Sequence, residues 1–339
     1  FFINLMKFLN KNDFISPKPI ENNEGKILNK FNTKKFILVN FLEGKPRFNI
    51  THNDCYLIGD LIGNLQNKSR YCDLIRKNSL SLEDCKKIFQ DCKNSISEKE
   101  IDNLSNGLCD LIEDSLKDCL EKWPSHLPKG IIHGDLFPDN VFFLNNKVSG
   151  VIDFYFSCVD IKIYEIAIVI NAWCFDQHNT LNIEKVKNLI KGFTLHNNLT
   201  KDELFSLNIL AKGASLRFLI TRLFDWYNTP ENSYVKRKDP QEYIDKFNEY
   251  EVLVIDDLGS TRMSEWETGI LDTIIATRYN ANLHTIFSSN LSYIGSKIHK
   301  QTKEDKILDY KIGERNVSRL FEMCKIIELR GHDYRKKTY

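Results

Sequence analysis

Acidic and amide side chains gather in one short segment of the sequence, and a further acid follows it. Asp135 stands five residues before Asn140 in the run His-Gly-Asp-Leu-Phe-Pro-Asp-Asn that starts at His133, and Asp153 comes thirteen residues after Asn140. Phosphoryl transfer requires a group that accepts the proton of the acceptor hydroxyl, and oxygen ligands for the Mg²⁺ on the nucleotide phosphates. The spacing therefore predicts Asp135 as the base and Asn140 and Asp153 as magnesium ligands.

These residues need strands to bring them together. Ile131 and Ile132 form a β-branched pair that predicts a strand ending at His133, and 147–152 predicts a second strand that delivers Asp153 to the same place. The alternative is that the polar residues are ordinary turn residues between the strands of a hairpin, because Asp, Asn, Pro and Gly are all common in turns.

The other segments up to about residue 250 predict a mostly helical structure. The run 34–42 is apolar and β-branched enough to predict a buried strand, which a turn at 43–46 ends. Apolar periodicity favours helices in four further places, namely 1–15, 51–66, 81–122 and 160–228.

Composition and charge argue against several classes of protein. The 339 residues are 42% hydrophobic and 27% charged, which is typical of a globular chain of two or three domains. The net charge of +1 predicts neither a nucleic-acid nor a membrane surface, and no apolar run approaches the ~20 residues of a membrane span. The nine cysteines include no CxxC pair, which argues against a zinc site and for reduced thiols. These thiols and a start without a signal peptide predict a cytoplasmic protein, and the lack of an initiator Met predicts a fragment.

The pattern changes near residue 250. A buried strand at 251–259, a helix at 264–279 and a second buried strand at 284–289 predict a strand–helix–strand unit with a parallel sheet. We therefore expect a domain boundary at about 248–250.

Residues 1–248 resemble bacterial homoserine kinase of the aminoglycoside-phosphotransferase-like, or protein-kinase-like, family. The resemblance implies an α+β fold, a protein-kinase-like C-lobe that is mostly helical with a small β active-site hairpin. Residues 1–45 would be a remnant of the N-lobe and hinge, and 46–248 would be the C-lobe. The stretches that carry the resemblance are Trp123–Leu144, Ser149–Cys158, Asn171–Phe175 and Leu216–Trp226.

The resemblance also implies roles for individual residues, with ATP and Mg²⁺ as cofactors and L-homoserine as substrate. Asp135 would be the base, Asn140 and Asp153 would bind Mg²⁺, and His133 would brace the loop that carries them. A hinge would meet the adenine through the backbone groups of Asn40, Phe41 and Leu42.

Three residues near the end of this part are candidates for contacts with the amino acid: Arg217, Arg222 and Asp225. The forked guanidinium of Arg binds both oxygens of a carboxylate. The alternative is that the three residues form ion pairs that tie helices together. Glu165 departs from the family pattern, which has Asp at the position after Tyr164.

A second departure concerns the part that precedes the hinge. The resemblance begins on the helix that would follow the strands of a small β-rich lobe, and no glycine-rich loop precedes 36–42. Without that lobe ATP would lose contacts to its phosphates, and positioning dominates this chemistry. We therefore expect little or no kinase activity. Homoserine-dependent ADP formation that is lost in Asp135→Ala would contradict this expectation.

Residues 251–339 resemble the C-terminal half of DnaC/IstB-like AAA+ ATPases, a partial α/β segment of the P-loop type. The resemblance rests on Leu253–Gly259, Ser288–Leu291, Ile312–Met323 and Gly331–Arg335. It implies that Asp256 holds Mg²⁺ through water, that Asp257 polarises the attacking water and that Asn290 orients this water. Arg319, or alternatively Arg315, would reach the nucleotide of a neighbouring subunit. The alternative for each is surface or capping chemistry. The sequence contains no GxxxxGK[ST] motif, so tight ATP binding is not expected here.

The sequence as a whole favours one function over two others. The leading function is ATP-dependent phosphorylation of the homoserine side-chain hydroxyl to O-phosphohomoserine in threonine biosynthesis, by a truncated or misjoined gene product. One alternative is a DnaC-like helicase-loader ATPase, with a helicase or nucleic acid as partner if the last segment functions. Another is a non-catalytic fusion remnant that acts through protein contacts. No membrane partner is expected.

Overall fold

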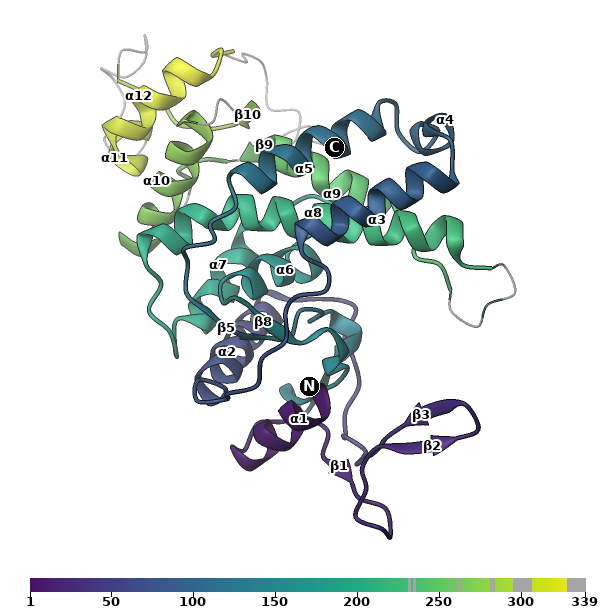
Figure 1. The fold of residues 1–339 in the computed structure, drawn as a ribbon. Helices are drawn as coiled ribbons and strands as arrows, with labels where there is room; N and C mark the ends of the chain where they lie inside the picture. Colours follow the sequence, from purple (N-terminus) through teal and green to yellow (C-terminus); the bar gives the residue numbers. More distant parts are fainter. Residues whose placement is uncertain are drawn as a thin grey trace, which may run out of the picture. The chain divides into compact units, whose positions relative to one another are not determined.

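The computed structural model describes residues 1–230, 233, 236–255, 257–260, 263, 265–280, 284–294 and 307–327. The chain divides into two units, Phe1–Tyr250 and Glu251–Tyr339 (Figure 1). The polypeptide passes from the first unit to the second at the end of α9, Gln241–Glu251.

The start of unit 1 is a helix followed by two narrow β-ribbons. The helix α1, Phe2–Lys11, buries Leu5, Met6 and Leu9 on one side. In the first ribbon β1, Pro19–Ile20, pairs antiparallel with β4, Leu38–Val39. In the second ribbon β2, Asn29–Phe31, pairs antiparallel with β3, Lys34–Phe36.

The expectation of a buried strand over 34–42 is wrong. The backbone there is divided between β3 and β4, and the side chains of Phe36, Leu38 and Phe41 are exposed, that of Phe41 by 84%. A ribbon of two strands has no second layer of its own to cover apolar side chains. The apolar run therefore lies on the surface of unit 1 in this structure.

Two glycines let a pair of helices pack at short range. A Cβ atom on Gly59 of α2, His52–Lys68, would lie 1.9 Å from the carbonyl oxygen of Leu189. A Cβ atom on Gly192 of α7, Ile183–Phe193, would lie 2.0 Å from the carbonyl oxygen of Tyr56. Both distances are far below van der Waals contact, so only glycine permits this approach of the two backbones.

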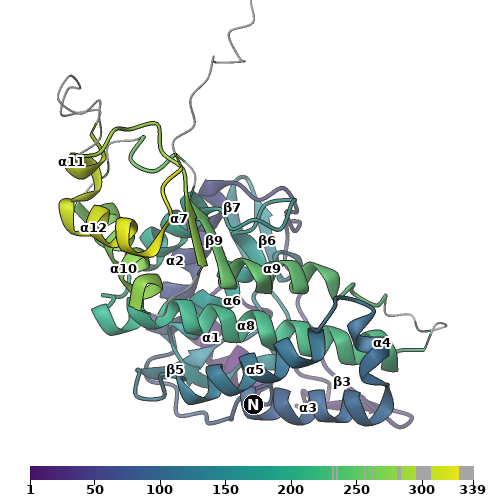
Figure 2. The same cartoon turned by 90° about the horizontal axis from the view of Figure 1, so that it is seen from above.

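The longest helix, α8, Lys201–Asn228, is at the centre of unit 1. The helices α3, Leu82–Ser95, α5, Leu108–Glu121, and α6, Tyr164–Trp173, pack against it, as Figure 2 shows. A short helix, α4, Glu98–Asp102, joins α3 to α5. By length and composition α8 could cross a membrane, but more than half of its apolar stretch is buried inside the unit, as in the core helix of a folded domain.

Two antiparallel strand pairs carry the polar residues singled out above. The strand β5, Lys129–Ile132, pairs with β8, Cys158–Ile161. Between them in sequence, β6, Val141–Leu144, pairs with β7, Lys147–Val151. The 3₁₀ turns Pro138–Asn140 and Phe154–Phe156 follow β5 and β7. The strands expected to end at His133 and before Asp153 are thus present.

Unit 2 contains the expected strand–helix–strand order. The strand β9, Val252–Ile255, lies parallel to β10, His284–Phe287, and α10, Glu265–Asn280, connects them. The helices α11, Leu308–Ile312, and α12, Glu314–Met323, follow. The second strand was expected to be buried, but Ile286 is 56% exposed, because the described sheet has two strands and leaves faces open. A small core joins Leu258, Leu271, Ile275, Ile312, Val317 and Leu320.

The glycine contact between α2 and α7 predicts the effect of one added methyl group. We expect Gly192→Ala to lower the free energy of unfolding by about 2–3 kcal/mol, because the new Cβ meets a backbone carbonyl that cannot move alone. Urea unfolding would measure the change. The matched control is Lys191→Ala, at an exposed position of the same helix, which should stay within about 0.5 kcal/mol of the wild type. Equal stability of the two variants would contradict the predicted close packing.

Candidate active site

The loop after β5 begins with a buried His and a glycine in a left-handed conformation. Gly134 has φ +78°, and a Cβ atom on it would lie 2.9 Å from the carbonyl oxygen of Phe156. Glycine is therefore required both by the backbone angle and by the space. This turn directs the next residue, Asp135, away from the strand and into the loop.

His133 braces this loop as a neutral side chain. Its Nε2–H donates to the carbonyl oxygen of Ile152 at 2.9 Å, and its ring meets Phe154 edge-on at a centroid distance of 4.8 Å. Burial lowers the pKa of His133 to about 4. The Nδ1 atom is buried and accepts no hydrogen bond from any described residue, which agrees with a neutral imidazole protonated on Nε2. His133 thus links the end of β5 to the residue before Asp153.

Glu165, at the start of α6, fixes the loop backbone by accepting its hydrogen bonds. Its carboxylate accepts hydrogen bonds from the backbone N–H of His133 and from that of Gly134, the latter at 3.1 Å. The side chain is fully buried, and burial raises its pKa to about 7, against the lowering effect of these two hydrogen bonds and of Arg217. The sequence showed Glu165 only as a departure from a family pattern. One feature of the sequence could have identified Glu165 as a buried functional residue: it is an acidic residue in the first turn of a helix that is otherwise almost entirely apolar.

Asp135 is a half-buried carboxyl group that accepts no hydrogen bond from the described residues. Burial raises the pKa of Asp135 to about 6, while the positive charge of Arg217 lowers it and the negative charge of Asp153 raises it. An acid with such a pKa is mostly ionised at neutral pH and still binds a proton readily. The side chain therefore has the availability and the proton affinity of a general base.

Asn140 and Asp153 present oxygen atoms from the two 3₁₀ turns. The Asn140 side-chain Nδ2 donates to the carbonyl oxygen of Asp135 at 2.8 Å, which leaves its Oδ1 available. The backbone carbonyl of Asn140 accepts from the N–H of Ile152 at 2.9 Å, so the turn with Asn140 is joined to the residue before Asp153. Asp153 is exposed, with φ 60° and ψ 61°, and its side chain accepts one long bond, 3.4 Å, from the N–H of Tyr155.

The side-chain oxygens of Asn140 and Asp153 suit a cation whose other ligands are water and phosphate oxygens. The described residues contain no group of three or more His, Cys, Asp or Glu that could hold a metal ion by themselves. Mg²⁺ at nucleotide sites typically uses one or two protein oxygens and completes its shell with phosphate and water. The donor set of Asn140 and Asp153 therefore fits Mg²⁺ with a nucleotide better than it fits a cation held by protein alone.

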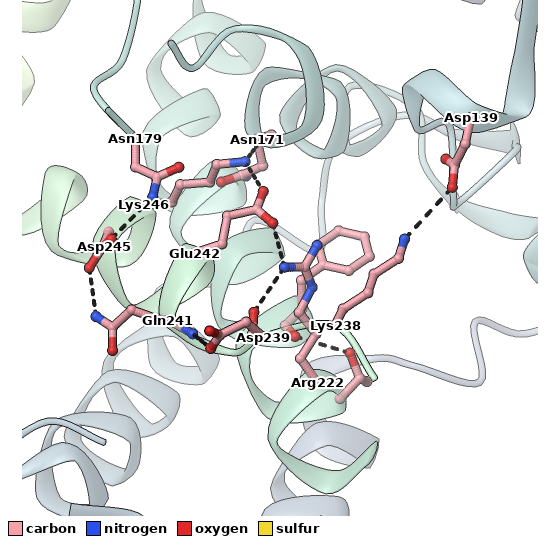
Figure 3. A network of polar contacts seen from close by, with 12 residues as sticks. Asp139, Asn171, Asn179, Arg222, Lys238, Asp239, Gln241, Glu242, Asp245 and Lys246 are labelled. Carbon is pink, nitrogen blue, oxygen red and sulfur yellow. Dashed lines mark hydrogen bonds and ion pairs between the residues drawn. The ribbon is translucent and has the colours of Figure 1, made fainter. Parts of the chain in front are cut away.

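The three candidate residues on α8 have different surroundings. Arg217 is 2% exposed, its buried Nε has no hydrogen-bond partner among the described residues, and its charge acts on Asp135. Arg222 donates to Glu242 at 2.6 Å (Figure 3). Asp225 is exposed, and in the described structure no ion pair joins it to either arginine.

The proposed hinge is on the surface in this structure. Asn40 accepts a hydrogen bond at Oδ1 from the N–H of Lys18 at 2.5 Å, and its own N–H donates to the carbonyl oxygen of Lys18 at 3.1 Å. Phe41 is exposed, and Leu42 packs on Gly150 in β7. Leu42 therefore connects this segment to the strand that leads to Asp153.

Comparison with known proteins agrees with this geometry. Residues 1–193 match the model of the phosphotransferase enzyme family. The homoserine kinase of Sinorhizobium medicae is 38% identical over 75% of this chain and 76% of its own length. That of Bartonella henselae is 40% identical over 73% of this chain and 76% of its own.

The chain belongs to the phosphotransferase enzyme family. Among solved structures, an amicoumacin kinase in complex with AMP-PNP and Ca²⁺ superimposes with a TM-score of 0.55 at 11% identity, covering 74% of each chain. A Plasmodium vivax ethanolamine kinase gives a TM-score of 0.51 at 14% identity, covering 73% of this chain and 70% of its own. These neighbours confirm the kinase-like fold, and the family confirms that the protein is a phosphotransferase.

In unit 2 the structure brings two of the predicted residues together. Asn290 donates from Nδ2 to Oδ1 of Asp257 at 2.8 Å, and the N–H of Asp257 donates to the hydroxyl of Ser288 at 3.0 Å. Arg315 and Arg319 both lie on α12, the first exposed and the second half-buried. Asp256 and the stretch Gly331–Arg335 lie outside the described residues.

The raised pKa of Glu165 predicts how the stability of this phosphotransferase depends on pH. The native carboxyl group has a pKa of about 7 against an ordinary value of 4.5, so its contribution to stability is complete below pH 4.5 and is lost as the pH rises through 7. Glu165→Gln removes this titration and keeps an oxygen for both loop N–H groups. We expect the free energy of unfolding of the variant, minus that of the wild type, to increase by on the order of 2 kcal/mol between pH 4.5 and 8.

Chemical unfolding at a series of pH values would measure this difference. Glu184→Gln, at an exposed position of α7, is the control and should show no such trend. A difference between Glu165→Gln and the wild type that is the same at every pH would show that native Glu165 titrates normally.

Proposed function

We propose that unit 1 transfers the γ-phosphoryl group of ATP to the side-chain hydroxyl of L-homoserine and forms O-phosphohomoserine and ADP, a step of threonine biosynthesis. The observation that supports this most directly is that the loop with Asp135 and Asn140 is hydrogen-bonded to Ile152, the residue before Asp153. The curated relatives bear the name homoserine kinase, which supports this acceptor. A neighbour in fold was solved with a nucleotide analogue and a divalent cation, which supports the donor.

In this proposal Asp135 handles the proton. Its carboxylate is ionised above a pKa of about 6, a value raised by burial, and it accepts the proton of the acceptor hydroxyl. The hydroxyl oxygen then forms a bond to the γ-phosphorus while the bond from that phosphorus to the bridging oxygen breaks and ADP leaves. His133 and Glu165 keep the loop backbone in place during this transfer.

Asn140 and Asp153 would hold Mg²⁺ against the nucleotide phosphates. When bound, the cation neutralises negative charge on the phosphate oxygens and orients them. The backbone groups of Asn40, Phe41 and Leu42 would meet the adenine. Arg217, Arg222 and Asp225 would lie around the amino-acid acceptor: Arg217 acts electrostatically on Asp135, Arg222 is paired with Glu242, and Asp225 is exposed further along α8.

Loss of the Asp135 carboxylate tests the proposal. We expect Asp135→Asn to lower kcat for homoserine-dependent ADP formation at least ~100-fold, because the acceptor proton then has no base. Coupled measurement of ADP with and without L-homoserine gives the rate, and nucleotide affinity should change little. The same assay on the wild-type chain tests the expectation of low activity raised by the sequence. Homoserine-dependent turnover that is equal in Asp135→Asn and wild type would refute the role of Asp135.

The positive charge of Arg217 lowers the pKa of Asp135 and should therefore set the pH at which the rate falls on the acid side of the pH–rate profile. In the wild type kcat/KM should fall below pH about 6, where Asp135 becomes protonated through a pKa raised by its burial. Because Arg217 lowers this pKa, Arg217→Met should move the limb to higher pH by roughly one unit. Arg217→Lys keeps the positive charge and serves as the control. An acid limb that stays in place in Arg217→Met, with circular dichroism showing a folded protein, would exclude this electrostatic coupling.

A second candidate function belongs to unit 2. The hydrogen bond between Asn290 and Asp257, beyond the ends of the parallel strands β9 and β10, supports a relation to DnaC/IstB-like AAA+ ATPases, with a helicase or nucleic acid as partner. The assay above separates the two functions. ATP hydrolysis that needs no homoserine and survives in Asp135→Asn would favour unit 2, and hydrolysis lost in that variant would favour unit 1.

A further inference from the structure

A lysine from the connection between α8 and α9 lies beside the loop that carries the proposed base. The ammonium group of Lys238 is 3.7 Å from a carboxylate oxygen of Asp139, the residue before Asn140 (Figure 3). It also lies 5.3 Å from the ring centre of Phe137, two residues after Asp135. Lys238 therefore brings a positive charge to the catalytic loop from a segment about a hundred residues later in the chain.

The residues on both sides of Lys238 are attached to α8. Arg237 donates from Nη1 to the carbonyl oxygen of Trp226 at 2.9 Å. The carbonyl oxygen of Asp239 accepts from Nη1 of Arg222 at 3.2 Å, and the Asp239 side chain caps α9 by accepting from the N–H of Gln241 at 2.9 Å. The backbone at Lys238 is thus held from both directions, while its side chain extends toward the loop.

Arg222 of α8 is committed to partners of the protein itself. Arg222 donates to Glu242 at 2.6 Å, and its guanidinium lies 4.4 Å from the ring centre of Tyr243. Glu242 also accepts from the buried ammonium of Lys246 at 2.5 Å (Figure 3). A ligand that replaced the partners of Arg222 would leave buried charges unpaired, which is costly. Arg217 is almost fully buried.

Lys238 differs because its ammonium remains accessible. Its side chain is 59% exposed and that of Asp139 is 53% exposed. An exposed ion pair of this length contributes little, so a second anion can approach the ammonium without a large cost.

We propose that Lys238 binds the carboxylate of the amino-acid acceptor and thereby places the acceptor hydroxyl at Asp135, with Arg222 as the residue that positions Lys238. This rests on the function proposed above, since homoserine is short and its carboxylate must lie near the base that takes its hydroxyl proton. An ammonium at this place favours an acceptor with an anionic group and disfavours one that carries only positive charge. A nucleotide phosphate is the other anion of this site, and the experiment separates the two.

Binding and turnover are measured on the full chain with two acceptors. L-Homoserine carries the carboxylate, and 3-aminopropan-1-ol is the same molecule without it. We expect Lys238→Met to weaken L-homoserine at least tenfold in calorimetric Kd and in KM, with kcat and the KM for ATP changed less than threefold. Binding of 3-aminopropan-1-ol should differ less than twofold between wild type and variant. Lys236→Met, which removes an exposed lysine of the same connection, is the control and should match the wild type.

The outcomes distinguish this inference from the proposed function. L-Homoserine binding that depends on Lys238 without ADP formation would support the inference and refute the proposed function. ADP formation with homoserine affinity unchanged in Lys238→Met would refute the inference alone. A raised KM for ATP with unchanged homoserine affinity would assign Lys238 to the nucleotide and overturn the inference. Absence of any L-homoserine binding to the wild type would also overturn it.

Discussion

The backbone N–H groups of His133 and Gly134 turn away from β5 into the interior, and they need an acceptor that the strand pair cannot provide. The buried carboxylate of Glu165 is that acceptor. An unpaired backbone N–H in this position would cost about 1–3 kcal/mol, so the loop depends on α6 lying beneath it. The left-handed turn at Gly134, the direction of Asp135 and the bond from His133 to Ile152 all follow from this arrangement.

A buried acid beneath the loop has an electrostatic consequence. Glu165 and Asp135 are both acids whose burial raises the pKa, and Arg217 is the buried cation that opposes this shift in both. Without this positive charge the pKa of both carboxyl groups would be higher still. Arg217 therefore favours the ionised form of Asp135, the proposed base.

The helical part of unit 1 places a second set of charges around the same loop. Arg222, Glu242 and Lys246 form a continuous ionic network between α8 and α9. Arg222 of this network also donates to the carbonyl oxygen of Asp239, and the neighbouring Lys238 extends to Asp139. The close contact of α2 with α7 through Gly59 and Gly192 joins two further helices of unit 1. The loop is thus positioned by helices that come from widely separated parts of the sequence.

The sequence by itself determined the chemistry and most of the local structure. The spacing of Asp135, Asn140 and Asp153 predicted phosphoryl transfer, which the family confirms, and the strands before the loop and before Asp153 are present. Local patterns carry this information because strand, turn and side-chain type are chosen within a few residues. The prediction of a buried strand at 34–42 was wrong, because an apolar run does not reveal whether other secondary-structure elements will pack over it.

Only the tertiary structure decided what surrounds those residues. Glu165 meets the loop from a helix some thirty residues away, Arg217 opposes the raised pKa of Asp135 from α8, and Lys238 approaches from the connection beyond it. Each of these contacts joins segments that are distant in sequence, and none has a spacing that a linear pattern could reveal. The catalytic set was therefore visible in the chain, while its electrostatic surroundings and the lysine beside it exist only after the helices have packed.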